Sequence, residues 1–282
     1  MMSLSPSFSK PEITMLDVEY ANATASEAAS TPVSAGNALG GMSPEELRAY
    51  MPVAQRKLRA GQYLYRAGQP FHALYLVTGG FLKTGLVAMD GREQITGFRM
   101  RGDLMGVESI GMTSHSCDAI ALDTSLVWEL PYPAVLEACA RLPRLQAQFT
   151  QTLAAEIRSD RGWMLALGTL SAEQRVAAFL LDVATRHEAM GFSARHFVLR
   201  MGRADIGSFL ALKHETVTRA LTHLGEQGCI AVRWREVHIL NARSLYAIAH
   251  GSAAAEPAFS SGRGSRARPA TALRADTVLA AA

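Results

Sequence analysis

The chain has 282 residues, of which 49% are hydrophobic and 19% are charged, and its formal net charge is +3. This length allows more than one domain with a sizeable core, and so small a net charge is a weak indication of a nucleic-acid partner. The sequence contains no apolar run long enough to span a bilayer and no signal-peptide core, so we expect a cytoplasmic protein. Cys117, Cys139 and Cys229 lie far apart, which argues against a disulfide framework and against metal-type spacing.

Both ends of the chain have biased compositions. Residues 1–42 are rich in Ser, Ala, Thr and Gly and can bury too little apolar surface to offset the entropy of ordering, which predicts a disordered segment. The tail, 251–282, is also of low complexity and is predicted to be disordered. Its arginines either add nonspecific attraction to phosphate or are solvated without a role.

Residues 43–142 are predicted to form a β domain. Ser43 and Pro44 begin a short helix. From residue 53 to 131, short alternating strands are separated by glycine turns, which indicates an all-β sandwich or barrel. The expected strands contain residues 62–66, 73–77, 80–85, 94–98 and 126–130, and the expected corners are Gly61, Gly68, Gly79, Gly91 and Gly102.

Residues 143–170 are predicted to form one long helix with a coiled-coil seam. Positions spaced alternately by three and four residues give this seam: Thr150, Leu153, Ile157, Asp160, Met164 and Leu167. A seam of this kind packs against a second helix. Asp160 is the exception, because two carboxylates that meet across a symmetric interface repel and lose solvation. One hypothesis is that Asp160 weakens dimerisation; the alternative is that it points outward or pairs with Arg158 or Arg161.

Residues 171–250 are predicted to form a winged helix-turn-helix. Ser171 and Gln174 give a capping-box pattern at the start of a helix. Residues 204–228 then carry two short apolar stripes, which two helices bury by crossing each other. Gly207 and Ala211 fall where these helices are expected to approach closely. Residues 229–240 alternate apolar and polar side chains and predict a β-hairpin, the wing.

The second helix of this motif has an exposed polar face that is suited to DNA. Glu215 and Arg219, spaced i and i+4, project from one side of its N-terminal half, the part that enters the major groove in a recognition helix. Arg219 can pair with guanine and Glu215 can accept from cytosine, with Thr218 beside them. Contacts to the DNA backbone are expected from His214, Thr216 and Thr222 on the helix and from Arg233 and Arg235 on the wing.

These residues resemble the CRP/FNR superfamily of bacterial transcription regulators. Residues 215–219 (ETVTR) match the E-x-x-S/T-R pattern of the FNR branch, and residues 59–85 resemble the family's β-roll sensor domain. The resemblance implies an α+β fold: a cyclic-nucleotide-binding-like β-roll (a double-stranded β-helix), a dimerisation helix and a C-terminal winged helix-turn-helix. It also implies binding of a homodimer to palindromic TTGAT-type DNA sites, and control of transcription initiation, either by recruiting RNA polymerase as an activator or by blocking it. By the same resemblance, the turn at Asp90, Gly91 and Arg92 is a candidate polymerase contact.

The chain departs from the family's known sensors. Cyclic-nucleotide members place an Arg near the position of Ser116 and Cys117, and without that cation cAMP binding is not expected. Iron–sulfur members use several N-terminal cysteines and a later one, where this chain has Trp128. Three scattered cysteines cannot supply the four thiolates of a cluster. We therefore expect no cluster and no cAMP.

Other chemistry remains open at the level of sequence. Cys117, or Cys139, is either a redox-sensitive thiol or a small apolar residue. His72 and His115 are either haem ligands or ordinary polar side chains in surface loops. A metal-dependent cupin would need clustered His and Glu ligands, and the β domain has no H-x-H pattern. Phosphate-loop, G-x-S-x-G and H-E-x-x-H motifs are absent, so we predict a non-enzyme. The alternative function is a small-molecule or redox sensor that acts through protein contacts without specific DNA readout.

Overall fold

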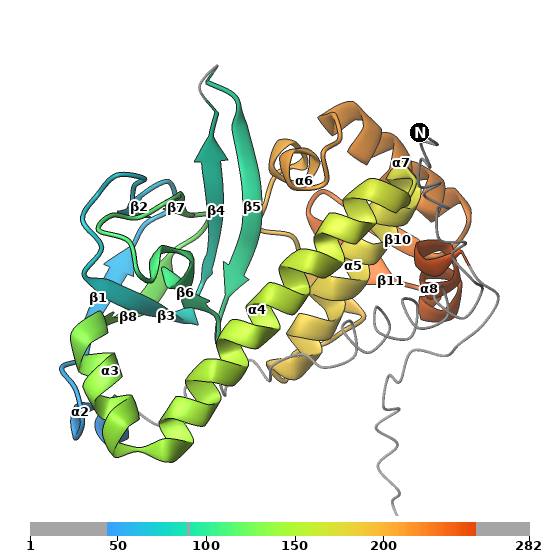
Figure 1. The fold of residues 1–282 in the computed structure, drawn as a ribbon. Helices are drawn as coiled ribbons and strands as arrows, with labels where there is room; N and C mark the ends of the chain where they lie inside the picture. The colour runs from blue at the N-terminus through green and yellow to red at the C-terminus, as the bar shows by residue number, and fades with distance from the viewer. Residues whose placement is uncertain (1–43, 89–90, 252–282) are drawn as a thin grey trace, which may run out of the picture.

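The computed structural model describes residues 44–88 and 91–251, and the predictions for the two terminal segments lie outside these residues. Within the described part, no helix is both long and apolar enough to cross a membrane. A β-roll forms the N-terminal part, the long helix α4 runs beside it, and a helical unit with a small sheet forms the C-terminal part (Figure 1).

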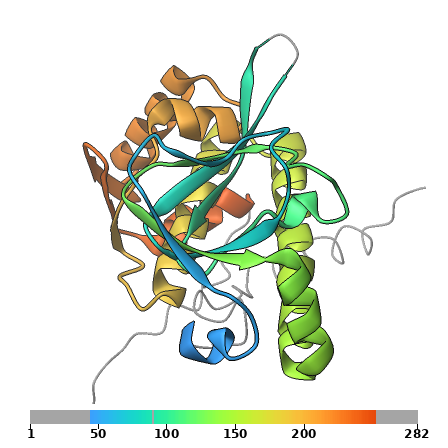
Figure 2. The ribbon, with the colours of Figure 1, turned by 90° about the vertical axis from the view of Figure 1, so that its left-hand side faces the viewer.

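Two antiparallel four-stranded sheets form the β-roll, which confirms the predicted β domain. Their strand orders are β1-β8-β3-β6 and β2-β7-β4-β5. Figure 2 shows these strands curling around a common interior. The interior is filled by apolar side chains of both sheets, including Leu64, Tyr75, Leu82 and Val127. The bounds are β1 Ala54–Leu58, β2 Tyr63–Tyr65, β3 Ala73–Gly79, β4 Phe81–Val87, β5 Glu93–Met100, β6 Leu104–Met105, η1 Val107–Ser109, β7 Asp118–Ala121 and β8 Ser125–Pro131.

One predicted corner is misplaced by one residue. Gly79 is the last residue of β3, whereas Gly80 adopts the left-handed conformation, with φ of 85°. A Cβ at Gly80 would lie 2.5 Å from Ser125 Cα, so only glycine fits this turn. The other four predicted corner glycines all have positive φ, as expected for turns.

Helices close the base of the β-roll and lead out of it. α2 (Pro44–Arg48) and α3 (Tyr132–Arg141) pack with the first turns of α4 (Pro143–Thr169) around buried side chains such as Leu47, Leu145 and Phe149. The long helix α4 matches the predicted range of 143–170 closely. Pro143 begins it, as expected from a residue without a backbone N–H.

The C-terminal part has the predicted winged helix-turn-helix architecture. α5 begins at a complete capping box made by Ser171 and Gln174, as the sequence predicts. The small antiparallel sheet has the order β10-β11-β9, and α8 packs against α5. The bounds are α5 Ala172–Ala189, β9 His196–Val198, α6 Arg203–Phe209, α7 His214–Glu226, β10 Ile230–Arg233, β11 Glu236–Ile239 and α8 Ala242–His250.

β5 joins the two parts of the molecule. It is an edge strand of its sheet, and α6 lies against it (Figure 1). The Ile95 amide donates to Ser208 Oγ at 2.9 Å, and Phe98 packs on Phe179 and Phe209 with ring centroids 5.8 and 5.3 Å away. The edge of the sheet is therefore covered by the C-terminal part rather than exposed to solvent.

Candidate DNA-binding interface

A glycine of α6 allows the turn that leads into α7 to pass close to α6. An added Cβ at Gly207 would lie 2.6 Å from the Leu212 carbonyl oxygen, so the predicted close approach at this residue is confirmed. The prediction for Ala211 is wrong: this residue is exposed in the turn and has a positive φ of 53°. The buried stripe of α7 consists of Val217, Ala220, Leu221 and Leu224, as predicted.

The polar face of α7 is presented to solvent. Glu215, Thr218, Arg219 and Thr222 are exposed, whereas Thr216 is half-buried. The hydroxyls of Thr218 and Thr222 donate to main-chain carbonyls one turn earlier, at 3.0 and 3.1 Å. Their methyl groups and oxygen lone pairs therefore remain for an outside partner. Within the described residues, Arg219 forms no ion pair. This arrangement suits base recognition, because the guanidinium fork does not have to leave a partner carboxylate.

The N-terminal turn of α7 adds features that favour an anion. Lys213, the N-cap, is exposed and caps the helix with no side-chain hydrogen bond. The first amide N–H groups and the positive end of the helix dipole are thus available to a phosphate. Sequence reasoning missed Lys213, although a lysine directly before a recognition helix is a readable signal. The Glu215 carboxylate at the same turn works against an anion, and its Oε1 lies 3.2 Å from His214 Nε2.

The wing is a tight hairpin with a basic tip. β10 and β11 are paired along their whole length, with Ile230 opposite Ile239 and Arg233 opposite Glu236. The turn residue Trp234 is 90% exposed and has a φ of 60°. Arg233 is exposed. Arg235 is also exposed, but its guanidinium donates to the Arg200 carbonyl at 3.2 Å, so this side chain is held against the neighbouring loop. An exposed Trp at the tip is a further contact candidate that the sequence analysis did not single out.

Arg203, the first residue of α6, is hydrogen-bonded to the wing. Its guanidinium donates to the Trp234 carbonyl at 3.1 Å. Burial, together with the nearby Arg235 charge, lowers the pKa of Arg203. The wing turn, α6 and the residues before α6 are thus tied together by arginine–carbonyl hydrogen bonds. This keeps the basic tip in a fixed relation to α7.

The seam of α4 is open in the single chain. Thr150, Ile157, Asp160 and Met164 are exposed, while Leu153 and Leu167 are half-buried. Within the described residues, Asp160 forms no ion pair with Arg158 or Arg161. Partial desolvation and the nearby Glu156 carboxylate raise the pKa of Asp160. Trp163 lies beside the seam and packs its ring against Phe209 of α6, with centroids 4.8 Å apart.

At the segment where the resemblance places the cyclic phosphate, the exposed Glu108 is held by two buried side chains of the β-roll. Glu108 accepts hydrogen bonds from Tyr65 and from the Cys117 thiol, at 3.1 and 3.2 Å. Burial, then the Glu108 carboxylate, raises the pKa of Cys117 to about 12, which disfavours the reactive thiolate.

The two histidines considered as haem ligands differ in their surroundings. The expectation that both lie in surface loops is wrong for His115, which is 3% exposed and stacks on Tyr65 with centroids 3.8 Å apart, whereas His72 is exposed. Burial lowers the pKa of His115. Its buried ring is part of the packed interior, a role that one sequence cannot distinguish from ligation.

The candidate polymerase contact is described only in part. Gly91 and Arg92 lie at the end of the β4–β5 hairpin, which projects from the β-roll (Figure 1), and both are exposed. Asp90 lies outside the described residues. Gly91 and Arg92 are thus accessible, whereas the residues that follow them at the start of β5, Glu93 to Ile95, contact Ser208 of α6.

Comparison with known proteins identifies the family. Residues 55–142 match the cyclic nucleotide-binding domain and residues 174–248 match the Crp-like helix-turn-helix domain. The chain is 40% identical over 197 residues to the transcriptional activator protein Anr of Pseudomonas protegens, with 70% of this chain and 81% of that protein covered. The chain belongs to the CRP/FNR family. This membership confirms the predicted fold class and identifies a sequence-specific DNA-binding transcription regulator.

Two further relatives support the assignment to the CRP/FNR family. The fumarate and nitrate reduction regulatory protein of Escherichia coli is 35% identical over 210 residues, which cover 74% of this chain and 84% of that protein. The solved structure of FixK2 from Bradyrhizobium japonicum superposes with a TM-score of 0.65 at 29% identity, covering 73% of this chain and all (100%) of that one. The regulator therefore shares both of its domains, in the same order, with members of the CRP/FNR family.

Proposed function

We propose that this regulator binds palindromic TTGAT-type sites as a homodimer and activates transcription initiation through contacts with RNA polymerase in the cytoplasm. The observation that carries the proposal is the exposed face of α7, where Arg219 has no partner carboxylate among the described residues and Glu215 lies one turn away. A recognition helix with one free guanidinium fork and one carboxylate can read a G·C pair and its neighbours.

The homodimer is supported by the open seam of α4. Met164 is 72% exposed and Ile157 is 51% exposed, and both lie on the side of the helix that the heptad pattern assigns to a partner. A palindromic site requires two recognition helices about one turn of DNA apart, which a two-fold symmetric dimer provides. The activator role is inferred from the name of the Anr relative. The polymerase contact at residues 90–92 rests on resemblance and on the exposed hairpin tip.

The proposed regulator works without an iron–sulfur cluster, without cAMP and without enzymatic activity. Its three cysteines are all buried, and they lie in different parts of the fold. At the family's phosphate-binding segment, the stacked rings of Tyr65 and His115 are buried, and the exposed Glu108 accepts a hydrogen bond from Tyr65. The proposal that cAMP is not bound rests on Ser116 and Cys117, which stand where cyclic-nucleotide members place the Arg that pairs with the phosphate.

The deciding experiment measures DNA binding by fluorescence anisotropy. The full-length protein, purified in air, is titrated onto a duplex with TTGAT-N4-ATCAA and onto a scrambled duplex at one fixed salt concentration, because the salt sets the nonspecific contribution. We expect preference for the palindrome. Equal, weak binding to both duplexes would contradict the proposal and favour a module that acts through protein contacts.

Variants of Arg219 separate base readout from charge. We expect Arg219→Ala to weaken binding to the palindrome by about 1–3 kcal/mol, the usual value of one bidentate base contact, with little change on the scrambled duplex. Arg219→Lys keeps the charge but loses the fork, so it should resemble Arg219→Ala on the palindrome. If Arg219→Lys binds like the wild type, Arg219 acts only on phosphate. As a matched control, Arg233→Ala should weaken binding to both duplexes alike.

A further inference from the structure

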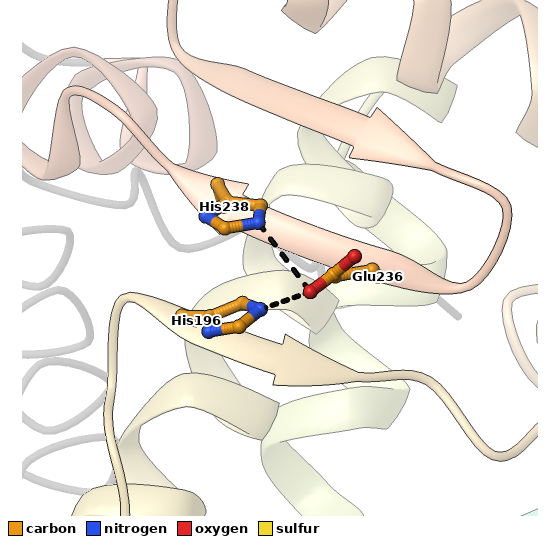
Figure 3. Close-up of side chains that lie close together, drawn as sticks. All are labelled: His196, Glu236 and His238. Atoms are coloured by element: carbon orange, nitrogen blue, oxygen red, sulfur yellow. Dashed lines mark hydrogen bonds and ion pairs between the residues drawn. The ribbon is translucent and has the colours of Figure 1, made fainter.

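Three potential metal ligands lie on one face of the wing sheet, outside the base-reading surface. β9 and β11 are antiparallel, and their register places His196 directly opposite His238. Glu236 is two residues before His238 on β11, so its side chain projects from the same face of the sheet. Figure 3 shows the two imidazole rings side by side, with both rings turned toward the carboxylate of Glu236.

The ligand atoms are close enough to share one ion. His196 Nε2 lies 2.5 Å from Glu236 Oε1, and His238 Nε2 lies 3.7 Å from the same oxygen. One ligand atom from each residue lies within 4.8 Å of the other two. Ligands about 2.0–2.2 Å from a tetrahedral zinc ion are roughly 3.4 Å apart, so small side-chain rotations suffice to reach that geometry. The side chains are 49%, 41% and 46% exposed, which leaves room for these rotations.

An ion pair alone accounts poorly for this arrangement. The imidazole rings of His196 and His238 stack with centroids 4.0 Å apart, so that both rings lie beside the single carboxylate of Glu236. Glu236 supplies one negative charge and also lies across from Arg233 in the hairpin. A divalent cation would use one nitrogen of each ring and the carboxylate together, whereas the hydrogen bond between His196 and Glu236 uses only one of the two rings.

We propose that His196, Glu236 and His238 form a binding site for a divalent transition-metal ion of the zinc class. Two imidazole nitrogens and one carboxylate oxygen are typical ligands for such ions, whereas magnesium and calcium prefer oxygen ligands alone. Three protein ligands leave a fourth position open to solvent. The ion would link β9 to β11 at the first residue after the wing turn and would hold Trp234 and Arg235 in place.

The first test measures zinc binding without DNA. The metal-free, full-length protein competes with a chromophoric zinc chelator in the presence of a non-chelating reductant. We expect one zinc ion per chain, unaffected by excess magnesium, and a loss of affinity of more than about tenfold in His196→Ala and in His238→Ala. His223→Ala is the matched control, because His223 is also an exposed histidine paired with a glutamate, Glu173 at 2.8 Å, but lies on α7.

The outcomes decide the proposal. It is overturned if the wild type takes up no stoichiometric zinc, or if His238→Ala binds zinc as tightly as His223→Ala does. Glu236→Gln keeps the shape and a hydrogen-bond acceptor, so a tenfold weaker affinity in this variant supports ligation even if an alanine variant is poorly folded. Cobalt in place of zinc adds an independent readout: visible absorption without a sulfur-to-metal charge-transfer band supports the His/Glu site, and such a band assigns the ion to a cysteine and overturns it.

A second test asks what the ion does, and this part rests on the proposed function. An ion of charge +2 beside Glu236 makes the wing more positive and more rigid, so zinc should tighten binding to both the palindromic and the scrambled duplex. His238→Ala should bind DNA as the metal-free wild type does and should not respond to zinc. If zinc binds in the first test but leaves DNA affinity unchanged, the site stands and its coupling to the wing is rejected.

Discussion

At the scale of single residues, Gly207 shows how one missing side chain permits the helix-turn-helix. Its carbon lies so near the Leu212 carbonyl that an added Cβ would meet a backbone atom at 2.6 Å, which no side-chain rotation relieves. We expect Gly207→Ala to destabilise the protein by about 1–3 kcal/mol, the usual effect of overpacking, and to reduce DNA binding. Thermal unfolding followed by circular dichroism measures the change.

Gly225 provides the matched control for this prediction. It also lies in a helix, but an added Cβ there would meet its nearest atom, the Ile230 carbonyl oxygen, at an ordinary 3.7 Å. Gly225→Ala should therefore be neutral or stabilise by up to about 1 kcal/mol through its helix propensity. If both variants lower the melting temperature equally, the close approach at Gly207 is not the cause.

Residue patterns predicted the recognition surface well but missed contacts that depend on strand register. The exposed Glu215 and Arg219 follow directly from helical spacing, and the buried stripe of α7 follows from the same period. The grouping of His196 with Glu236 and His238 depends on which residues of β9 and β11 face each other. A short strand before the helix-turn-helix does not reveal that register, although the E-x-H spacing on β11 was a visible signal.

At the scale of elements, α4 joins two apolar surfaces with different partners. Its first turns are buried under the β-roll, with Leu145 and Phe149 in the core, whereas its middle presents Ile157 and Met164 to solvent. We expect Ile157→Glu and Met164→Glu each to weaken dimerisation, since each replaces apolar side chains that normally contribute about 1.5–3 kcal/mol when buried. Sedimentation velocity over a range of concentrations measures the dissociation constant.

The same measurement tests Asp160. With two carboxylates removed from a symmetric seam, Asp160→Ala should tighten the dimer. Ser159→Glu is the control, because Ser159 is exposed on α4 but lies one position before the seam residue Asp160 and outside the heptad pattern. An unchanged dissociation constant in Asp160→Ala rejects the hypothesis that this carboxylate opposes dimerisation. A weaker dimer in Ser159→Glu would mean that a negative charge anywhere on this part of α4, and not only on the seam, weakens dimerisation.

Elements with strong periodicity were predictable, and weakly patterned ones were not. α4 and the wing match the sequence predictions within a residue or two, because apolar spacing and turn residues define both. The sequence analysis did not single out β1, whose residues AQRKL are mostly polar, or α8, which follows the wing directly. β1 takes its place by pairing with β8, so its conformation depends on a distant partner rather than on its own residues.

At the scale of the whole molecule, β5 makes the β-roll and the DNA-binding part share one core. Ile95 and Phe98 belong to β5, yet they are buried in the same cluster as Phe179, Phe209 and Leu210. The alternation of apolar and polar residues along β5 predicted a strand. It did not reveal that part of the buried face of this strand packs on the C-terminal domain. Polar contacts surround this core: Lys83 pairs with Asp205 at 3.0 Å, and Arg186 donates to the Phe98 carbonyl at 3.0 Å.

A shared core predicts cooperative unfolding of the two parts. We expect the wild type to unfold in one calorimetric transition, measured at a fixed protein concentration because dimerisation contributes to stability. Phe98→Ala removes the central ring of the interface, at a cost of about 3–5 kcal/mol, and should separate the transition into two. Val127→Ala is the control, because Val127 is fully buried within the β-roll alone. Val127→Ala should lower the melting temperature and keep a single transition. Two transitions in the wild type would contradict the shared core.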